Sequence, residues 1–327
     1  MLHPLRQILT SGRLVAMASL TALGLGVAAS AAPAATATAT ASAPIVTVNP
    51  VVLKDAAQGK EILLRVTAPR DGKQLPIILF SHGAQYSKDD YLPLTEFWAS
   101  HGYVVIQPTH IESRALGLSR EDSRIKDAWK SRVLDLRKAL DSLDEIVRQA
   151  PVLKGRLDSK TVLAAGHSFG GHTTAALIGA QMPDMPVTDL SDSRVRAGLM
   201  LAPPGIMPGF LNVKWKADSK PALSIVGMDD VIPGFNDDWK AHAQYYYERQ
   251  GGPQCLAAMT GMKHYLGGTL GTNRTEEKTP SAESMQQVER LSLAFLDYYA
   301  KGTKDWETVR TELLASRPPI VGLFECK

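Results

Sequence analysis

The motif GHSFGG at residues 166–171 constrains the fold of this chain more than any other segment. It follows a run of apolar and β-branched residues, 161–165, and opens a helical pattern that extends to about residue 180. A serine between a strand and a helix, with glycine two positions before and after it, is typical of a sharp turn that exposes its hydroxyl. A side chain at position 166 or 170 would clash where the strand and the helix close around the turn. The sequence therefore predicts that Ser168 is a nucleophile at the end of a central strand.

Short apolar runs typical of buried strands alternate with helical patterns along the chain. This alternation predicts an α/β fold with a mostly parallel central sheet and helices on both faces. The irregular segments 109–124 and 203–221 follow strands, at the edge where such sheets bind ligands. We expect strands near residues 61–68, 76–81, 103–107, 161–165, 196–202, 222–226 and 255–259, and helices near 92–101, 125–148, 168–180, 239–250 and 284–301.

The first 31 residues have the pattern of a secretory signal peptide. Arg6 and Arg13 precede an apolar run, Leu14–Ala28, and the small residues Ala29-Ser30-Ala31 form a site for signal peptidase. The run of about fifteen residues is short for a membrane-spanning helix, and an uncleaved anchor is the alternative. We expect a secreted or periplasmic protein with no membrane span in its mature form.

The segment that follows, 32–44, is rich in Ala, Thr and Pro and predicts a linker. We expect a single catalytic domain over residues 45–327. Its two cysteines, Cys255 and Cys326, permit one intramolecular disulfide in an exported protein. Such a bridge would close about seventy residues and hold the C-terminal segment in place. The alternative is a pair of unrelated thiols.

A serine hydroxyl needs a base, and the base needs an acid that orients it. In this architecture the acid and then a histidine each follow a later strand. The strand near 222–226 leads to two adjacent carboxylates, and we expect Asp230 to be the acid, with Asp229 as the alternative. The strand that begins at residue 255 leads into a glycine-flanked loop in which His264 is placed to act as the general base.

The oxyanion that forms during acyl transfer needs two hydrogen-bond donors. We expect one to be the backbone N–H of Phe169, which follows the nucleophile, and the other to be the backbone N–H of Ala84, with Gln85 next. Loop residues at the same edge of the sheet are candidates for the substrate pocket. These are Gln85, Tyr86, His110 and Trp215.

The formal net charge of +3 is too small to indicate a nucleic-acid-binding surface. The sequence contains no zinc-type cluster of Cys and His, no H-E-x-x-H motif, no P-loop and no dinucleotide-binding fingerprint. We therefore expect no metal and no other cofactor.

At these motifs the chain resembles the α/β-hydrolase family, and among its members the secreted bacterial esterases described as chlorophyllase-like, dienelactone-hydrolase-like or polyester-hydrolase-like. The resemblance implies a Ser–His–Asp triad, no cofactor and an ester substrate. Three positions differ from those patterns: Ser168 replaces the cysteine of dienelactone hydrolases, Phe169 the arginine of plant chlorophyllases, and Ala84 the aromatic residue of polyester hydrolases. The segments that carry the resemblance are FSHGAQYSKDDY, YVVIQPTH, GHSFGGHT, VGMDD and GMKHYLGG, within residues 60 to 300.

The sequence thus predicts an exported serine hydrolase that cleaves carboxylic esters through an acyl-enzyme. A short-chain carboxylesterase is favoured because no long apolar lid is evident. The alternatives are a polyester or cutin hydrolase or a lipase, then an amidase or acyltransferase, and last a non-catalytic binding protein. We expect a monomer that binds a small-molecule or polymeric ester and no nucleic acid.

Overall fold

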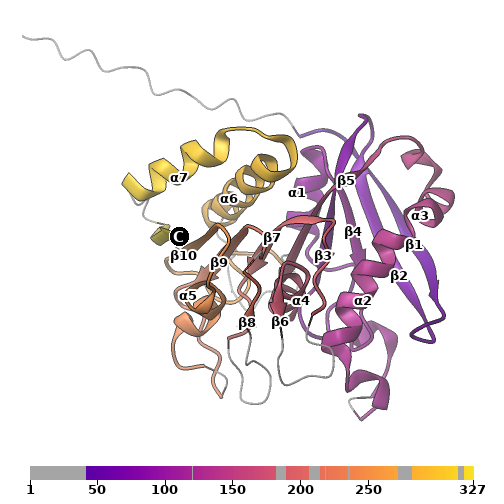
Figure 1. Ribbon diagram of the computed structural model, residues 1–327, viewed down its shortest axis with the longest axis horizontal. Helices are drawn as coiled ribbons and strands as arrows, with labels where there is room; N and C mark the ends of the chain where they lie inside the picture. The colour runs from indigo at the N-terminus through magenta and orange to yellow at the C-terminus, as the bar shows by residue number, and fades with distance from the viewer. Residues whose placement is uncertain are drawn as a thin grey trace, which may run out of the picture. The chain divides into compact units, whose positions relative to one another are not determined.

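A computed structural model describes residues 42–119, 121–181, 189–205, 214–217, 219–234, 236–271, 282–315 and 320–327. These residues lie in one compact unit (Figure 1). The predicted signal peptide, nearly all of the predicted linker and part of the segment 203–221 lie outside the described residues.

A nine-stranded sheet forms the centre of this unit, in the order β1-β2-β4-β3-β5-β7-β9-β10-β11. The strands from β4 to β10 in this order are parallel, whereas β1, β2 and β11 pair antiparallel at the two ends. The predicted mostly parallel sheet is therefore confirmed. The strands are β1 (Ile45–Asp55), β2 (Lys60–Pro69), β3 (Leu75–Ser81), β4 (Val104–Pro108), β5 (Leu157–His167), β7 (Val195–Leu201), β9 (Ala222–Gly227), β10 (Gln254–Met259) and β11 (Val321–Cys326), and a separate ribbon pairs β6 (Ala180–Gln181) with β8 (Lys214–Trp215).

Helices cover both faces of the sheet, as predicted (Figure 1). Successive side chains of a strand point to opposite faces, so Ile77 of β3 lies in one core and Ile78 in the other. The first core includes apolar side chains of α2, α3 and α4, and the second includes those of α1, α6 and α7. The α-helices are α1 (Leu92–Ser100), α2 (Ala128–Asp141), α3 (Leu143–Gln149), α4 (Phe169–Leu177), α5 (Gln244–Glu248), α6 (Ala282–Lys301) and α7 (Asp305–Ala315), with 3-10 turns η1 (Arg114–Leu116), η2 (Ser123–Ile125), η3 (Pro151–Leu153) and η4 (Trp239–Ala243).

Two of the predicted helices are broken. The helix expected over 125–148 consists of η2, α2 and α3, because Ser142 leaves the helical conformation at φ −114° and ψ 26°. The apolar stripe continues across this break, since Leu143 and Val147 still pack against the core. The helix expected over 239–250 is likewise η4 followed by the short α5.

The predicted disulfide joins Cys255 of β10 to Cys326 of β11. The two residues are register partners in the antiparallel pair that closes one end of the sheet, and 71 positions separate them. A bridge that closes a loop of this length stabilises the fold by about 4 kcal/mol in the loop-entropy model. The C-terminal strand is thereby fixed to the strand that leads to His264.

Among the residues that the structure describes, no helix has both the length and the apolar character that a membrane crossing requires.

Candidate active site

Ser168 lies on the sharp turn that the sequence predicts between β5 and α4. Its backbone is in a strained conformation, with φ 53° and ψ −122°, and its N–H donates to the carbonyl oxygen of Leu201 at 2.8 Å. A Cβ at Gly166 would collide with the carbonyl oxygen of Gly170, and one at Gly170 with that of Ser81. These contacts explain why both glycines are required. Ser168 itself is only partly buried.

Asp230 and His264 meet at the same edge because the parallel strands β9 and β10 precede their loops. His264 Nδ1 lies 2.8 Å from Asp230 Oδ2. Burial alone would raise the pKa of Asp230, but its contacts with His242 and His264 hold it well below its usual range. The carboxylate therefore stays ionised and orients the imidazole, with Nδ1 as donor and Nε2 as acceptor. Asp229, the alternative acid, is exposed and has no contact of this kind with His264 among the described contacts.

Hydrogen bonds through His167 join the three loops that form the site. The N–H of Gly83 donates to Tyr91 Oη at 3.2 Å, and Tyr91 Oη lies 2.8 Å from His167 Nδ1. His167 Nε2 lies 2.7 Å from the carbonyl oxygen of His264. Because a carbonyl only accepts, Nε2 carries the hydrogen and Nδ1 accepts from Tyr91. Burial lowers the pKa of His167 to about 3, so the ring stays neutral and keeps this arrangement.

The loop after β3 holds the second expected oxyanion donor. β3 and β5 are parallel neighbours in which Ser81 pairs with Gly166, so the loops that follow them lie side by side. Ala84, on the first loop, is exposed, and Phe169 begins α4 on the second. This register places the two expected donors at one edge of the sheet.

A cavity of about 770 Å³ lies beside the β3 loop. Tyr86 Oη and Tyr265 Oη are 2.9 Å apart, and Tyr265 follows His264 in the chain, which connects the cavity to the histidine loop. Its lining is largely polar and includes Ala84, Gln85, Tyr86, Ser113, Arg114 and Tyr265. Gln85 and Tyr86 line this cavity, whose lining does not include Ser168 or His264, so their place in a substrate pocket stays a prediction.

The other two expected pocket residues do not line this cavity. His110 is completely buried between Ser81 and Asp135, where both of its ring nitrogens are hydrogen-bonded. Trp215 packs edge-on against Tyr245, and the guanidinium of Arg249 lies 4.6 Å from its ring centre.

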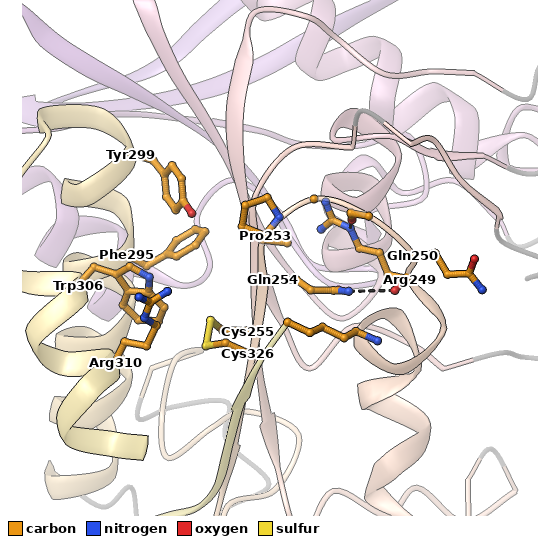
Figure 2. Close-up of a pocket in the computed structure, with 14 residues that line it drawn as sticks. Arg249, Gln250, Pro253, Gln254, Cys255, Phe295, Tyr299, Trp306, Arg310 and Cys326 are labelled. Carbon is orange, nitrogen blue, oxygen red and sulfur yellow. Dashed lines mark hydrogen bonds between the residues drawn. A yellow bond between two sulfur atoms is a disulfide. The ribbon is translucent and has the colours of Figure 1, made fainter. Parts of the chain in front are cut away.

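A second cavity, of about 860 Å³, lies beside the disulfide (Figure 2). It is formed where β9 and β10 begin, with Ala222 and Gln254 in its wall. Ligands of open α/β sheets bind at the carboxyl ends of the strands. The cavity in Figure 2 is therefore on the opposite edge from Ser168 and does not belong to the candidate site.

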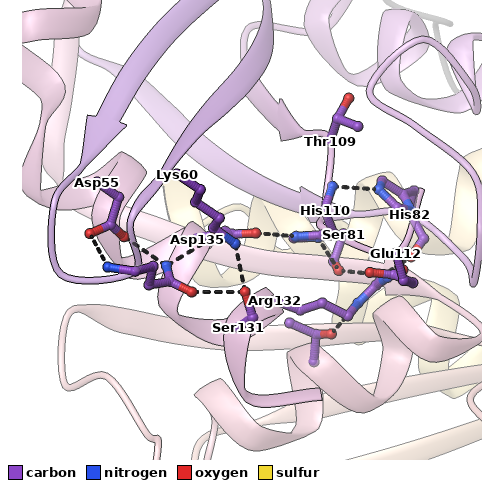
Figure 3. A network of polar contacts seen from close by, with 12 residues as sticks. Asp55, Lys60, Ser81, His82, Thr109, His110, Glu112, Ser131, Arg132 and Asp135 are labelled. Atoms are coloured by element: carbon purple, nitrogen blue, oxygen red, sulfur yellow. Dashed lines mark hydrogen bonds and ion pairs between the residues drawn. The ribbon is translucent and has the colours of Figure 1, made fainter. Parts of the chain in front are cut away.

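A buried polar network supports the loop after β3 (Figure 3). Arg132 of α2 is completely buried and donates to the carbonyl oxygen of His82 and, at 3.1 Å, to Ser81 Oγ. It also pairs with Glu112, and its guanidinium lies 4.6 Å from the ring centre of Phe169. Arg132 thus contacts both segments that carry the expected oxyanion donors. The sequence offered no signal for this role, because Arg132 reads as part of the charged face of a helix.

One group of carboxylate and imidazole atoms among the described residues is as compact as a metal site. The group consists of Asp230, His242 and His264, with ligand-type atoms within 4.8 Å of one another. We interpret it as one carboxylate that pairs with two imidazole rings, because Asp230 contacts both His242 and His264.

The parallel sheet, the strained serine turn after β5, and the aspartate and histidine after β9 and β10 have the arrangement of the α/β-hydrolase fold. Comparison with known proteins agrees. Residues 38–188 match the chlorophyllase family model. The chain is 27% identical to a chlorophyllase type 0 of Chenopodium album over 137 residues, which is 40% of this chain and 37% of that protein. It is 24% identical to a platelet-activating factor acetylhydrolase of Cavia porcellus over 280 residues, 73% of this chain and 60% of that protein.

The predicted resemblance to chlorophyllase-like α/β-hydrolases is therefore confirmed. The chain spans less than two thirds of the length of both relatives.

Proposed function

We propose that the chain is an ester hydrolase that acts through Ser168, His264 and Asp230. The observation that carries the proposal is the 2.8 Å hydrogen bond between His264 and Asp230, at the same sheet edge as the strained Ser168. The two relatives support it, because one is named a chlorophyllase and the other an acetylhydrolase.

In the proposed reaction, His264 Nε2 takes the proton of Ser168 while Oγ attacks the carbonyl carbon of the ester. The N–H groups of Phe169 and Ala84 bind the resulting oxyanion. Collapse of this intermediate releases the alcohol, which takes the proton from His264, and leaves the acyl group on Ser168. A water molecule then gives a proton to His264 and attacks the acyl group. The carboxylic acid is released as Ser168 Oγ leaves and takes the proton back from His264, which restores both residues.

We propose a short acyl chain as the preferred substrate group. The lining of the cavity beside the β3 loop is largely polar, with hydroxyl groups from Tyr86, Ser113 and Tyr265 and a cation from Arg114. Long alkyl chains would gain little from such a wall, because the hydrophobic effect requires burial of apolar surface. The printed name of the relative from Cavia porcellus, an acetylhydrolase, favours the same choice.

Hydrolysis of p-nitrophenyl esters from acetate to palmitate tests the proposal, with Ser168→Ala as the control. We expect a rate that depends on Ser168 and falls with chain length. A rate that rises toward palmitate would indicate a lipase, and activity on polyester films would indicate a polyester or cutin hydrolase. If no ester is cleaved, labelling by a fluorophosphonate would favour an amidase or acyltransferase, and absence of labelling a binding protein.

We also propose that the protein is exported and acts as a monomer without a cofactor. The leader-like pattern of residues 1–31 and the disulfide between Cys255 and Cys326 support export, because disulfides persist in oxidising compartments.

A further inference from the structure

The proposed reaction gives no role to His242, although its side chain contacts Asp230. It lies in η4, is 4% exposed, and its ring centre is 5.3 Å from that of His264. Its Nε2 lies 3.2 Å from Asp230 Oδ2, the same oxygen that pairs with His264 Nδ1. Two histidines therefore share one oxygen of the carboxylate that follows β9.

The second nitrogen of the His242 ring determines where its hydrogen lies. Nδ1 is 2.8 Å from the carbonyl oxygen of Pro203, which only accepts, so Nδ1 carries a hydrogen. In a neutral ring, Nε2 would then present a lone pair to the negatively charged oxygen of Asp230. That contact is repulsive, whereas a second proton on Nε2 makes it an ion pair. The contact has the distance of an ion pair without the alignment of a full hydrogen bond, so charge is what holds it.

Among the residues that the structure describes, the carboxylate that pairs with His242 is that of Asp230. η4 packs against β9, which has no titratable side chain, and against α5, which carries Glu248 and three tyrosines. Asp238 and Lys240 lie on its own turn, and Asp238 accepts from the N–H of Lys240. Toward the site, the ring faces Asp230 and His264, with His167 beyond them.

We propose that His242 is a positioning residue of the triad, which as an imidazolium pairs with Asp230 and sets the lower pH limit of activity. The inference rests on the proposed hydrolase function. A cation beside Asp230 competes for the carboxylate that stabilises protonated His264, and it also repels that proton directly. Both effects favour the unprotonated form of His264, which is the form that acts as a base. A triad with His242 therefore works at lower pH than one without it.

The variant His242→Gln separates the effect of a positive charge at position 242 from that of the contact with Asp230. Glutamine places a nitrogen near the position of Nε2 and can donate to Asp230, but it carries no charge. In a profile of kcat/KM against pH for p-nitrophenyl acetate, we expect the midpoint of the acidic limb to rise by roughly one pH unit. We expect the rate on the high-pH plateau to change less than the rate at acidic pH.

His172→Gln is the matched control. His172 is as deeply buried, at 1% exposure, but its Nδ1 pairs with Tyr245 Oη instead of a carboxylate. We expect its acidic limb to keep the wild-type midpoint. An unchanged midpoint in His242→Gln, or a rate lowered equally at every pH, would overturn the proposal, because either result indicates a contact without a charge effect.

The charge on His242 is also measurable without turnover. In Ser168→Ala protein labelled with ¹⁵N, both ring nitrogens of His242 should carry hydrogen at neutral pH, with the signals assigned by their loss in His242→Gln. A bare ring nitrogen would refute the proposal even if the wild type hydrolyses esters. A charged ring in a protein that hydrolyses no ester would reject the hydrolase function and still support the pair with Asp230.

Discussion

Among the described residues, the histidine–aspartate pairs His110–Asp135 and His264–Asp230 have almost the same length, but they differ in their access to the surface. In the buried pair, His110 Nδ1 is 2.9 Å from Asp135 Oδ2, and Ser81 Oγ is 3.0 Å from His110 Nε2 (Figure 3). All three side chains have no exposed surface. In the open pair, His264 Nδ1 is 2.8 Å from its aspartate, and the histidine side chain is 15% exposed. Contact geometry alone therefore does not distinguish a reactive centre from a structural one.

What distinguishes the two pairs is the environment of each member. Ser168 is held at a positive φ on a turn, whereas Ser81 ends an extended strand and its hydroxyl also accepts from Arg132. A general base must take up a proton, but burial, Arg132 and then Lys60 hold the pKa of His110 well below its ordinary value. The buried pair therefore cannot act as a base near neutral pH.

The activities of the variants should differ most when Ser168 and Ser81 are each replaced by alanine. We expect Ser168→Ala to lower the rate of p-nitrophenyl acetate hydrolysis by roughly 10⁵-fold or more, because it removes the nucleophile. We expect Ser81→Ala to keep the rate within about tenfold of wild type, since only support for the β3 loop is lost. Circular dichroism checks that both variants are folded. If the two losses were equal, the distinction between the pairs would be wrong.

Replacing the two aspartates is the next test. We expect Asp230→Asn to lower kcat by roughly 10⁴-fold, because an amide no longer fixes the hydrogen on Nδ1 of the histidine that acts as base. Asp135→Asn should leave kcat within about tenfold of wild type. Steady-state kinetics on the short-chain ester measures both values. A large loss of kcat in a folded Asp135→Asn variant would mean that the buried pair takes part in the reaction.

The sequence predicted the open pair and missed the buried one for a physical reason. Ser168 follows a strand within a glycine motif, and Asp230 and His264 each follow a later strand, so local patterns and chain order locate them. Parallel register then brings the ends of those strands together. The mostly parallel sheet with helices on both faces was predicted from the alternation of short apolar runs with helical patterns.

Asp135 and Arg132 lie within a helix whose charged positions resemble any solvated face. Both side chains are buried through contacts with other parts of the chain, Arg132 with the β3 loop and Asp135 with Lys60 of β2. The residue pattern of the helix does not show these contacts. His110 was therefore expected in the pocket, where its position after β4 would place it, and not in the network. The edge strands β1 and β11 were also not predicted. Each is stabilised by pairing with a neighbouring strand, and its own residues do not show that partner.

Arg132→Met should have the largest effect on stability within the network. It leaves Glu112 and the carbonyl oxygen of His82 without their buried partner, and removing one member of a buried pair costs about 3–5 kcal/mol. Arg290→Met is the matched control, because Arg290 pairs with Glu312 at the surface, where an ion pair contributes less than about 1 kcal/mol. Urea unfolding followed by circular dichroism gives both values. Equal losses would show that the network carries no special stability.

The smallest and most specific difference concerns pH. Burial raises the pKa of Asp135 to about 6, whereas that of Asp230 is held well below 3.8, as burial is outweighed by His242 and His264. Between about pH 4 and 6 the folded protein therefore binds more protons at Asp135 than the unfolded chain does, and this contribution to stability falls as pH rises. A shift of about two units corresponds to roughly 3 kcal/mol. The contribution of Asp230 has the opposite sign, because it is present above about pH 4 and is lost as pH falls further.

Urea titrations from pH 3 to pH 7 on the wild type, Asp135→Asn and Asp230→Asn separate these contributions. The free energy of unfolding of the wild type relative to Asp135→Asn should decrease as pH rises from 4 to 6. Relative to Asp230→Asn, it should decrease as pH falls below 4. Because asparagine does not titrate, each difference reports one carboxyl group together with the histidines that it contacts. If both differences in the free energy of unfolding changed in the same direction with pH, the pKa values of Asp135 and Asp230 would be shifted in the same direction. The two pairs would then differ in solvent access alone.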